Sequence, residues 1–392
     1  MFYFAEAVRI KFKELFNEEP VIVRSPGRAN LIGEHTDYNL GFVLPCAIDK
    51  AIYFAVAPRQ DKYCKLFALN MNQTFETSID HLKKSEKGWP NYLMGVLDQL
   101  NKAGYTFTGF NCVFGGDIPV GAGLSSSAAL EAGLAFTLNH IFDLSIDKLS
   151  LVKIAQKAEN EFVGVQCGIM DQFINIFGKS GAVLRIDCRS LEYQYFPFEF
   201  DDVAIVLFNS NVSHSLASSQ YNQRRKECSE GVNHIKKYER HVESLRDVSV
   251  EMLNGFKSTL DPTVYRRCKY VVEENNRLLQ ACASLEREDL KAFGRAMIQT
   301  HDGLSLDYEV SCPELDYLVD LVRDNPHVYG ARMMGGGFGG CTINLIQPGS
   351  VDRISALVKE KYFQKFGIET TPYVTAISSG TSILDVNESA KV

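Results

Sequence analysis

Hydrophobic and polar residues follow two periodicities along this chain, and together they predict both helices and strands. The N-terminal stretch MFYFAEAVRIKFKELF mixes Glu, Arg and Lys with its apolar residues, which predicts an amphipathic helix rather than a signal peptide. The apolar run at residues 203–208 lies between polar residues and is typical of a buried strand that opens a second domain. Because helix-like and strand-like segments alternate in both halves, we expect two mixed domains, at residues 1–200 and 201–392.

Composition supports a two-domain globular protein. The 392 residues exceed the size at which one hydrophobic core stops growing, and 45% of them are hydrophobic. A formal net charge of −7 argues against nucleic acid as a partner, since phosphate backbones are bound by clustered Lys and Arg. No apolar stretch approaches the roughly 20 residues that span a bilayer, so we expect no membrane partner. Ten cysteines without a C-x-x-C pair favour a reducing cytoplasm over a disulfide framework or a zinc site.

A glycine-rich stretch in the first half carries the clearest chemistry. Residues 115–130 read GGDIPVGAGLSSSAAL, and Leu134, Leu138 and Ile141 continue at helical spacing. Glycines let the backbone approach a ligand closely, and the free N–H groups at a helix N-terminus bind phosphate. An ordinary capped turn is the alternative, but this cluster of glycines with three consecutive serines before a helix favours phosphate. The stretch lacks the Gly-Lys-Ser/Thr ending of a Walker A loop, which indicates a different nucleotide site.

A second glycine cluster, at residues 335–340, formally contains the G-x-G-x-x-G pattern of dinucleotide-binding proteins. Glu360 even follows about 20 residues later, as that pattern requires. However, the pattern also requires a helix directly after it, whereas residues 341–346 alternate like a strand. A nicotinamide-dependent dehydrogenase is therefore a poor interpretation.

Two acidic residues lie in apolar surroundings. Glu159 falls on or beside the apolar face of the helix predicted over residues 151–162, and a carboxylate there needs a partner. A buried salt bridge and a Mg²⁺ ion, which prefers carboxylate and hydroxyl oxygens, are equal alternatives. Asp171 lies among small and apolar residues and raises the same question, with a helix cap as its other explanation.

The most polar stretch of the chain is GRANLIGEHTDY at residues 27–38, where six polar side chains surround one Leu-Ile pair without metal-binding spacing. With residues 121–130 and 335–342, it resembles the three motifs of galactokinases in the GHMP small-molecule kinase superfamily. The resemblance covers essentially the whole chain. The two glycine motifs are shared across the superfamily. The Gly-Glu-His-Thr-Asp-Tyr run is the specific one, because the mevalonate and homoserine branches diverge there.

The resemblance implies which residues bind the substrates, galactose and ATP. Distinguishing galactose from its epimers requires fixed hydrogen-bond donors and acceptors, because an unpaired buried polar group is costly. The residues implied for the sugar are Glu34, His35, Thr36, Asp37, Gly168 and Tyr221. Those implied for the phosphates of ATP are Gly121, Ala122, Gly123, Leu124, Ser125, Ser126 and Ser127. Trp89 is a candidate for contact with adenine, although an aromatic residue is by default a core residue.

The resemblance also implies a reaction, the transfer of the γ-phosphoryl group of ATP to the anomeric hydroxyl of galactose, which is the first committed step of galactose catabolism. Asp171 would accept the hydroxyl proton, and Arg28 would keep this aspartate ionised and stabilise the developing charge. Ser127 and Glu159 would bind Mg²⁺.

In fold terms, the resemblance implies an α+β protein. Its N-terminal domain would be like domain 2 of ribosomal protein S5, and its C-terminal domain would be ferredoxin-like. The active site would lie between them, and the final residues are candidates to return to the first domain. The sequence leaves the oligomeric state open, with a monomer as the expectation.

Two rival functions are compatible with the sequence. An N-acetylgalactosamine kinase shares the fold and most motifs but must accommodate an acetamido group, and no single residue excludes it. A non-catalytic galactose and ATP sensor would bind the same ligands, yet its known form lacks two residues of the phosphate loop. Here Ser127-Ala128-Ala129 is uninterrupted, which favours an enzyme.

Overall fold

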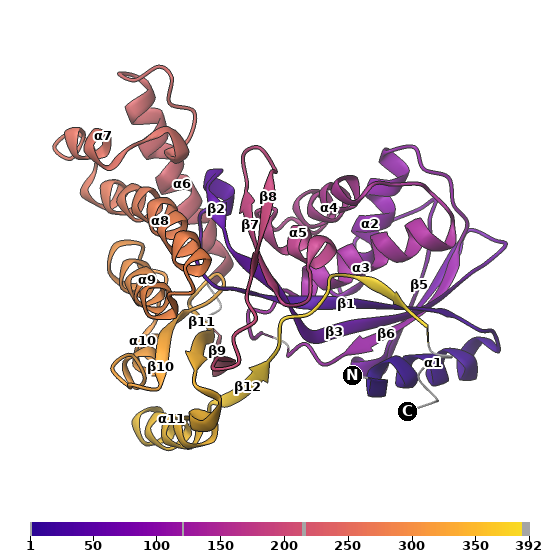
Figure 1. Ribbon diagram of the computed structural model, residues 1–392. Coiled ribbons are helices and arrows are strands. Elements are labelled where there is room, and N and C mark those ends of the chain that lie inside the picture. Colours follow the sequence, from indigo (N-terminus) through magenta and orange to yellow (C-terminus); the bar gives the residue numbers. More distant parts are fainter. Residues whose placement is uncertain (1, 120, 214–216, 386–392) are drawn as a thin grey trace.

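The computed structural model describes residues 2–119, 121–213 and 217–385 (Figure 1). The first half is organised around a six-stranded sheet that is antiparallel except between its strands β4 and β6. In spatial order the strands are β13 (Ser382–Leu384), β1 (Val21–Asn30), β3 (Pro45–Pro58), β6 (Phe110–Gly116), β4 (Tyr63–Ala68) and β5 (Gln73–Ser78). The central strand β3 carries the β-branched and aromatic run AIYFAVA, and it is buried on both faces because helices cover the sheet on either side.

Helix α1 (Phe2–Phe16) covers one face of this sheet and confirms the amphipathic helix predicted at the N-terminus. It buries Ala5, Val8 and Phe12, which recur at helical spacing, against Tyr53 and other residues of the sheet. The other helices of the first half are α2 (Pro90–Lys102), α3 (Ser126–Ile141), α4 (Lys148–Lys157) and α5 (Met170–Phe177). Of these, α3 and α5 pack directly on β1 and β3. The short helical turns are η1 (Asp37–Asn39) and η2 (Leu69–Met71), with the π-helical turn η3 (Ala158–Val163) directly after α4.

A small three-stranded sheet lies beside the larger one. Its strands are β2 (Phe42–Val43), β7 (Ala182–Asp187) and β8 (Tyr193–Pro197). Because β2 directly follows the polar stretch of residues 27–38, this sheet fixes the far end of that stretch.

The second half has a four-stranded antiparallel sheet. Its strands in spatial order are β12 (Thr371–Thr375), β9 (Ala204–Ser213), β11 (Gly339–Ile346) and β10 (Val328–Met333). In chain order this arrangement is 4-1-3-2, with helices between the first and second strands and between the third and fourth. That is the ferredoxin-like topology predicted from the sequence. Strands β9 and β11 also confirm the strands predicted at residues 203–208 and 341–346, so the G-x-G-x-x-G pattern does not open a helix.

Most helices of the second half form a group on the side away from the large sheet, on the left of Figure 1. They are α6 (Ala217–Lys236), η4 (Leu245–Asp247), α7 (Val250–Gly255), α8 (Pro262–Glu286), α9 (Leu290–Asp302), the π-helical turn η5 (Gly303–Asp307) and α10 (Pro313–Asp320). The turn η6 (Pro348–Ser350) and helix α11 (Val351–Phe366) connect β11 to β12. No helix of the described residues has the length and apolar character that a membrane crossing requires.

The two halves are joined by more than one connection. The predicted boundary near residue 200 falls between β8 and β9. After β12 the chain crosses back, and β13 pairs with β1 through Leu384 and Ile22 (Figure 1). One hydrophobic core also extends through both halves, since Leu207 and Ile343 of the second sheet belong to the same cluster as Leu31.

Candidate active site

A cavity of about 360 Å³ is lined by residues of both halves. Its wall brings together seven of the residues predicted for the site, which are Arg28, Glu34, His35, Asp37, Gly168, Asp171 and Tyr221. Other parts of the wall are residues 164–167 and the start of the second glycine cluster, Gly335 and Gly336. Segments as far apart in sequence as β1 and α6 therefore meet at one place.

The polar stretch reaches the cavity as a tight turn between β1 and β2. Gly33 and His35 both have positive φ, at 87° and 61°, and for a histidine this is a strained conformation that is typical of functional sites. The Thr36 hydroxyl lies 2.9 Å from the Gly33 carbonyl oxygen and holds the turn closed. Thr36 itself is fully buried, and the structure does not bring it to the cavity wall.

Arg28 and Asp171 form the central ion pair of the site. Arg28 Nε lies 2.7 Å from Asp171 Oδ1, and Nη2 lies 2.9 Å from Oδ2, so the pair is bidentate. The third guanidinium nitrogen donates to the Gly123 carbonyl, and the Ser125 hydroxyl donates to Asp171 Oδ2. This carboxylate is therefore fixed at the junction of the cavity and the glycine-serine loop.

Glu34 is held by an arginine that sequence reasoning missed. Arg332, at the end of β10, is fully buried and donates to Glu34 Oε2 at 2.7 Å. Its other nitrogens donate to backbone carbonyls, among them that of Leu31 at 2.8 Å. The second half thus orients a carboxylate of the first half, and the only sequence signal was one arginine in the apolar run VYGARMM.

Asp37 lies directly against Gly168, which explains why a glycine is needed there. A Cβ atom at position 168 would lie 1.7 Å from Asp37 Oδ2, closer than any real contact. Burial, reinforced by the charge of Asp171, raises the pKa of Asp37 to about 7. The cavity therefore contains a carboxyl group that changes its charge near neutral pH.

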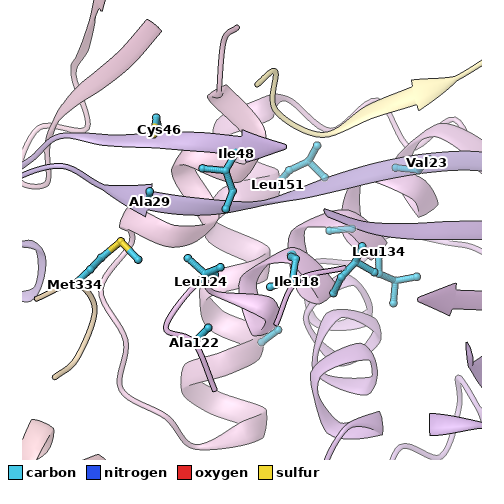
Figure 2. Close-up of a cluster of buried hydrophobic side chains, with 14 of the residues drawn as sticks. Val23, Ala29, Cys46, Ile48, Ile118, Ala122, Leu124, Leu134, Leu151 and Met334 are labelled. Carbon is cyan, nitrogen blue, oxygen red and sulfur yellow. The ribbon is translucent and has the colours of Figure 1, made fainter. Parts of the chain in front are cut away.

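The predicted phosphate loop enters α3 at Ser126, as its glycine-serine pattern indicated. Ala122 and Leu124 are buried in the common core beside Ile118 and Met334 (Figure 2). Gly121 and Gly123, by contrast, are exposed. The loop is thus anchored by alternate side chains, and only its backbone and serines are available to a ligand. Ser125 is the N-cap residue, but its hydroxyl bonds Asp171 instead of capping the helix. Val120, just before the loop, lies outside the described residues.

The sequence predicted a continuous α-helix around Glu159, but this residue lies on the π-helical turn η3. The Gly164 N–H bonds the Glu159 carbonyl at 2.8 Å, which widens the helix by one residue. The Glu159 side chain is only 6% exposed, and its Oε2 accepts from Gln172 Nε2 at 2.8 Å and from Cys167 Sγ at 3.3 Å. The apolar surroundings predicted for this carboxylate are confirmed, and its partners in the described chain include no cation.

Several acidic side chains lie close together around Glu159. Burial raises the pKa of Glu159, the charge of Asp171 raises it further, and hydrogen bonds from Cys167 and Ser127 oppose the rise. Glu131, a second residue that sequence reasoning missed, is fully buried beside it, and the two carboxyl groups share a hydrogen bond. Burial also raises the pKa of Glu131 well above its usual value.

This arrangement fits Mg²⁺ bound together with a nucleotide. Ser127 and Glu159 offer hard oxygen ligands, and the surrounding carboxyl groups favour a cation. No group of three or more His, Cys, Asp and Glu in the described chain could hold a metal ion by itself. A magnesium ion here would need phosphate oxygens and water to complete its shell, which is its usual mode in kinases.

Trp89 lies in the hydrophobic core. It is 7% exposed, its ring packs against Phe114, and its indole N–H donates to Gln73 at 2.9 Å. This is the default that the sequence suggested for an aromatic residue, and its contact with adenine stays a prediction.

Family models match the chain in three regions. Residues 10–58 match the galactokinase galactose-binding signature, residues 91–179 the N-terminal domain of GHMP kinases, and residues 281–364 the C-terminal domain of GHMP kinases. The first match contains the strained turn, and the second contains the phosphate loop, Glu159 and Asp171.

Whole-chain relatives agree with these matches. The chain is 43% identical to a galactokinase of Roseiflexus sp. over 95% of each chain, and 42% identical to one of Clostridium acetobutylicum over 94% of this chain and 96% of the relative. The crystal structure of Lactococcus lactis galactokinase complexed with galactose superposes with a TM-score of 0.92 at 36% identity, covering 97% of this chain and 99% of that one. The mevalonate kinase of Methanococcus jannaschii shares only the fold, with a TM-score of 0.64 at 17% identity over 92% and 99% of the two chains.

Proposed function

Because this chain belongs to the galactokinase family of GHMP kinases, we propose that it transfers the γ-phosphoryl group of ATP to the anomeric hydroxyl of D-galactose. The products are α-D-galactose 1-phosphate and ADP. The observation that carries the proposal is the bidentate Arg28–Asp171 pair, which lies in the cavity wall and touches the glycine-serine loop through Gly123 and Ser125. One carboxylate is thus in reach of both proposed substrates.

In this proposal Asp171 accepts the proton of the anomeric hydroxyl while that oxygen attacks the γ-phosphorus atom. The bond to the β-phosphate oxygen breaks, and ADP leaves with the electron pair. Arg28 holds the carboxylate in one orientation and places positive charge beside the transferring group. The sugar is oriented by Glu34 and Asp37, which accept hydrogen bonds from its other hydroxyls, with His35 and Tyr221 completing the wall.

The nucleotide lies along the loop of residues 121–127 in this proposal. The first N–H groups of α3 have no partners within the helix, and its first turn contains no acidic residue, so both features favour phosphate. Ser127 and Glu159 hold Mg²⁺, which neutralises phosphate charge when bound. We infer a monomer, in which both halves of a single chain form the cavity.

The direct test is to incubate the protein with ATP, Mg²⁺ and a panel of sugars, measuring ADP release and identifying the product by phosphorus NMR. Galactose should be the preferred acceptor, phosphorylated at C1, and omission of Mg²⁺ should abolish turnover. Preference for N-acetylgalactosamine would support that kinase instead. Tight binding of galactose and ATP without ADP release would support a sensor.

A further inference from the structure

A chain of buried hydroxyl groups connects the proposed sugar site to the helical group of the second half. His35 Nδ1 lies 2.8 Å from the Tyr38 hydroxyl oxygen, which lies 2.8 Å from the Tyr308 hydroxyl oxygen. The Tyr308 hydroxyl in turn lies 3.3 Å from Cys228 Sγ. We call this series of hydrogen bonds, from His35 to Cys228, the relay. Tyr38 and Tyr308 lie 270 residues apart in the sequence, and the proposed phosphoryl transfer gives neither of them a role.

Tyr308, which lies farther from the sugar site than Tyr38, is held in place by residues of the second half. Tyr308 is fully buried, and its ring packs on that of Tyr270 with centroids 4.8 Å apart. Arg224 donates to the carbonyls of Tyr308 and Glu309, at 2.6 and 2.8 Å. The position of the Tyr308 hydroxyl is therefore fixed by the second half of the chain, independently of any sugar.

The direction of the hydrogen bonds follows from acid strength. A phenol is a stronger acid than a neutral imidazole N–H, and an imidazole nitrogen is a better acceptor than a phenol oxygen. The Tyr38 hydroxyl therefore donates to His35 Nδ1, the Tyr308 hydroxyl donates to the Tyr38 oxygen, and the Cys228 thiol donates to Tyr308. With its Nδ1 accepting, a neutral imidazole carries its hydrogen on Nε2. His35 is neutral at pH 7, because burial lowers its pKa to about 4.

We propose that Tyr38 and Tyr308 are positioning residues that fix His35 in the Nε2–H tautomer, so that the ring adds a neutral hydrogen-bond donor to the sugar site, beside the acidic side chains of Glu34 and Asp37. The Nε2 atom is buried without a side-chain partner among the described residues, and the backbone of Gly336, another residue of the wall, is hydrogen-bonded to the ring. His35 belongs to the cavity wall with Glu34 and Asp37. An ionised carboxylate only accepts hydrogen bonds, so a sugar oxygen that must accept one needs a donor such as the Nε2–H group of His35. The inference rests on the proposed function, since it assigns a role within the galactose site.

The first experiment observes the tautomer without using activity. Full-length protein labelled with ¹⁵N-histidine should show His35 protonated at Nε2, with the signal assigned by its loss in His35→Gln. In Tyr38→Phe the Nδ1 partner is missing, and we expect a mixture of both tautomers. A wild-type ring protonated at Nδ1 overturns the proposal, and this outcome does not require Tyr38→Phe to fold.

The second experiment measures specificity. Tyr38→Phe should raise the KM for galactose about tenfold, the equivalent of one lost hydrogen bond, and leave the KM for ATP within about twofold. Wild-type protein should discriminate strongly against one of the 2-, 3-, 4- and 6-deoxygalactoses, and Tyr38→Phe should lose that discrimination. Tyr308→Phe should have a smaller effect of the same kind, about threefold, because the Tyr38 to His35 bond is kept.

Tyr362→Phe is the matched control. Tyr362 is fully buried and donates its hydroxyl to the Ser210 carbonyl at 2.8 Å, away from the cavity wall. The Tyr362→Phe variant should lose as much thermal stability as Tyr38→Phe does, and its KM for galactose should equal that of the wild-type protein. An equal rise in galactose KM in both variants would reduce the relay to a structural role and overturn the proposal. If wild-type protein does not phosphorylate galactose, the proposed function fails instead, whatever tautomer is observed.

Discussion

The proposed sugar site and the proposed phosphate site, called the sugar end and the phosphate end below, differ in how their polar groups are satisfied. At the sugar end, the side chains are held by protein partners before any ligand binds, as Glu34 is by Arg332 and His35 by Tyr38. At the phosphate end, the carboxyl groups of Glu159 and Glu131 are crowded together, and burial raises the pKa of both. We infer that the sugar end is preorganised for specificity, whereas the crowded carboxyl groups of the phosphate end favour a cation.

The contrast has a physical reason. A neutral sugar supplies only hydrogen bonds, so its site must fix donors and acceptors in advance to discriminate between hydroxyl groups. A metal–nucleotide complex supplies large charges of its own, so its site gains from unbalanced charge. Asp171 lies at the boundary, with its charge paired by Arg28 and its position within reach of both ends.

Substitution at this boundary should have the largest effect. Asp171→Asn keeps the shape of the side chain and removes the base, so kcat should fall by about 10³-fold. Galactose affinity should change by less than about tenfold, because the amide still fills the same place in the cavity wall. Calorimetry with galactose and a coupled assay of ADP release separate the two quantities. Near-normal turnover would exclude Asp171 as an essential base.

Gly168→Ala should damage the sugar end alone. The new Cβ atom would displace the Asp37 carboxylate, since it would lie 1.7 Å from Oδ2. Loss of a charged hydrogen bond of this kind costs roughly 1.5 to 3 kcal/mol, or about one to two decades in kcat/KM for galactose. The KM for ATP should stay within about twofold.

Gly336→Ala is the control for this substitution. It adds the same methyl group to the same cavity wall, but its nearest neighbour, Tyr221 Cδ2, is at an ordinary contact distance of 3.7 Å. A loss in Gly336→Ala as large as that in Gly168→Ala would mean that the cavity tolerates no added volume at all, and that displacement of Asp37 is not the cause.

Glu159→Gln should affect the phosphate end alone, by a smaller factor. It removes an anionic oxygen ligand from the proposed magnesium site and keeps the volume, so the Mg²⁺ concentration that gives half-maximal turnover should rise about tenfold. The KM for galactose should not change. Magnesium titrations at saturating ATP measure the effect, and an unchanged magnesium requirement would leave Glu159 with only a structural role.

The sequence predicted local features better than long-range partners. Periodicity located β9 and β11, the glycine-serine pattern located the start of α3, and the apolar face around Glu159 indicated its burial. The π-helical turn at Glu159 was not predicted, because the preceding residues have an ordinary helical pattern. The same reasoning that isolated Glu159 applies to Glu131, a single acidic residue in the run AALEAGLAF, and would have found it.

The missed partners share a different cause. Arg332 lies 298 residues from Glu34 along the chain. Such contacts depend on how the two halves pack, which no local pattern encodes. A buried arginine in an apolar strand indicates that an acidic partner exists, without indicating which one. The sugar signature could therefore be located from the sequence, whereas the residues that orient it could not.

The smallest expected effect concerns the stability cost of the sugar end. The pKa of Asp37 rises from 3.8 to about 7 on folding, mainly through burial and then through the charge of Asp171. Because the folded protein disfavours the charged form, this group reduces stability progressively as the pH rises from about 4 to about 7, and the loss is constant at higher pH. Asp37→Asn carries no charge, so its Tm relative to wild type should increase over that interval and then level off.

At pH 8 the Tm of Asp37→Asn should exceed that of the wild-type protein by on the order of a few degrees, and this difference should disappear near pH 4. Thermal unfolding of both proteins from pH 4 to 8.5 measures it, with Asp201→Asn at an exposed position as the control that should show no such dependence. The same variant should bind galactose more weakly, since the amide nitrogen that replaces one carboxylate oxygen cannot accept a hydrogen bond from a sugar hydroxyl. A variant that is more stable and less active would show that the sugar end is preorganised at the expense of folding stability. A Tm difference that does not vary with pH would mean that Asp37 is already neutral, or already solvated, across the whole range.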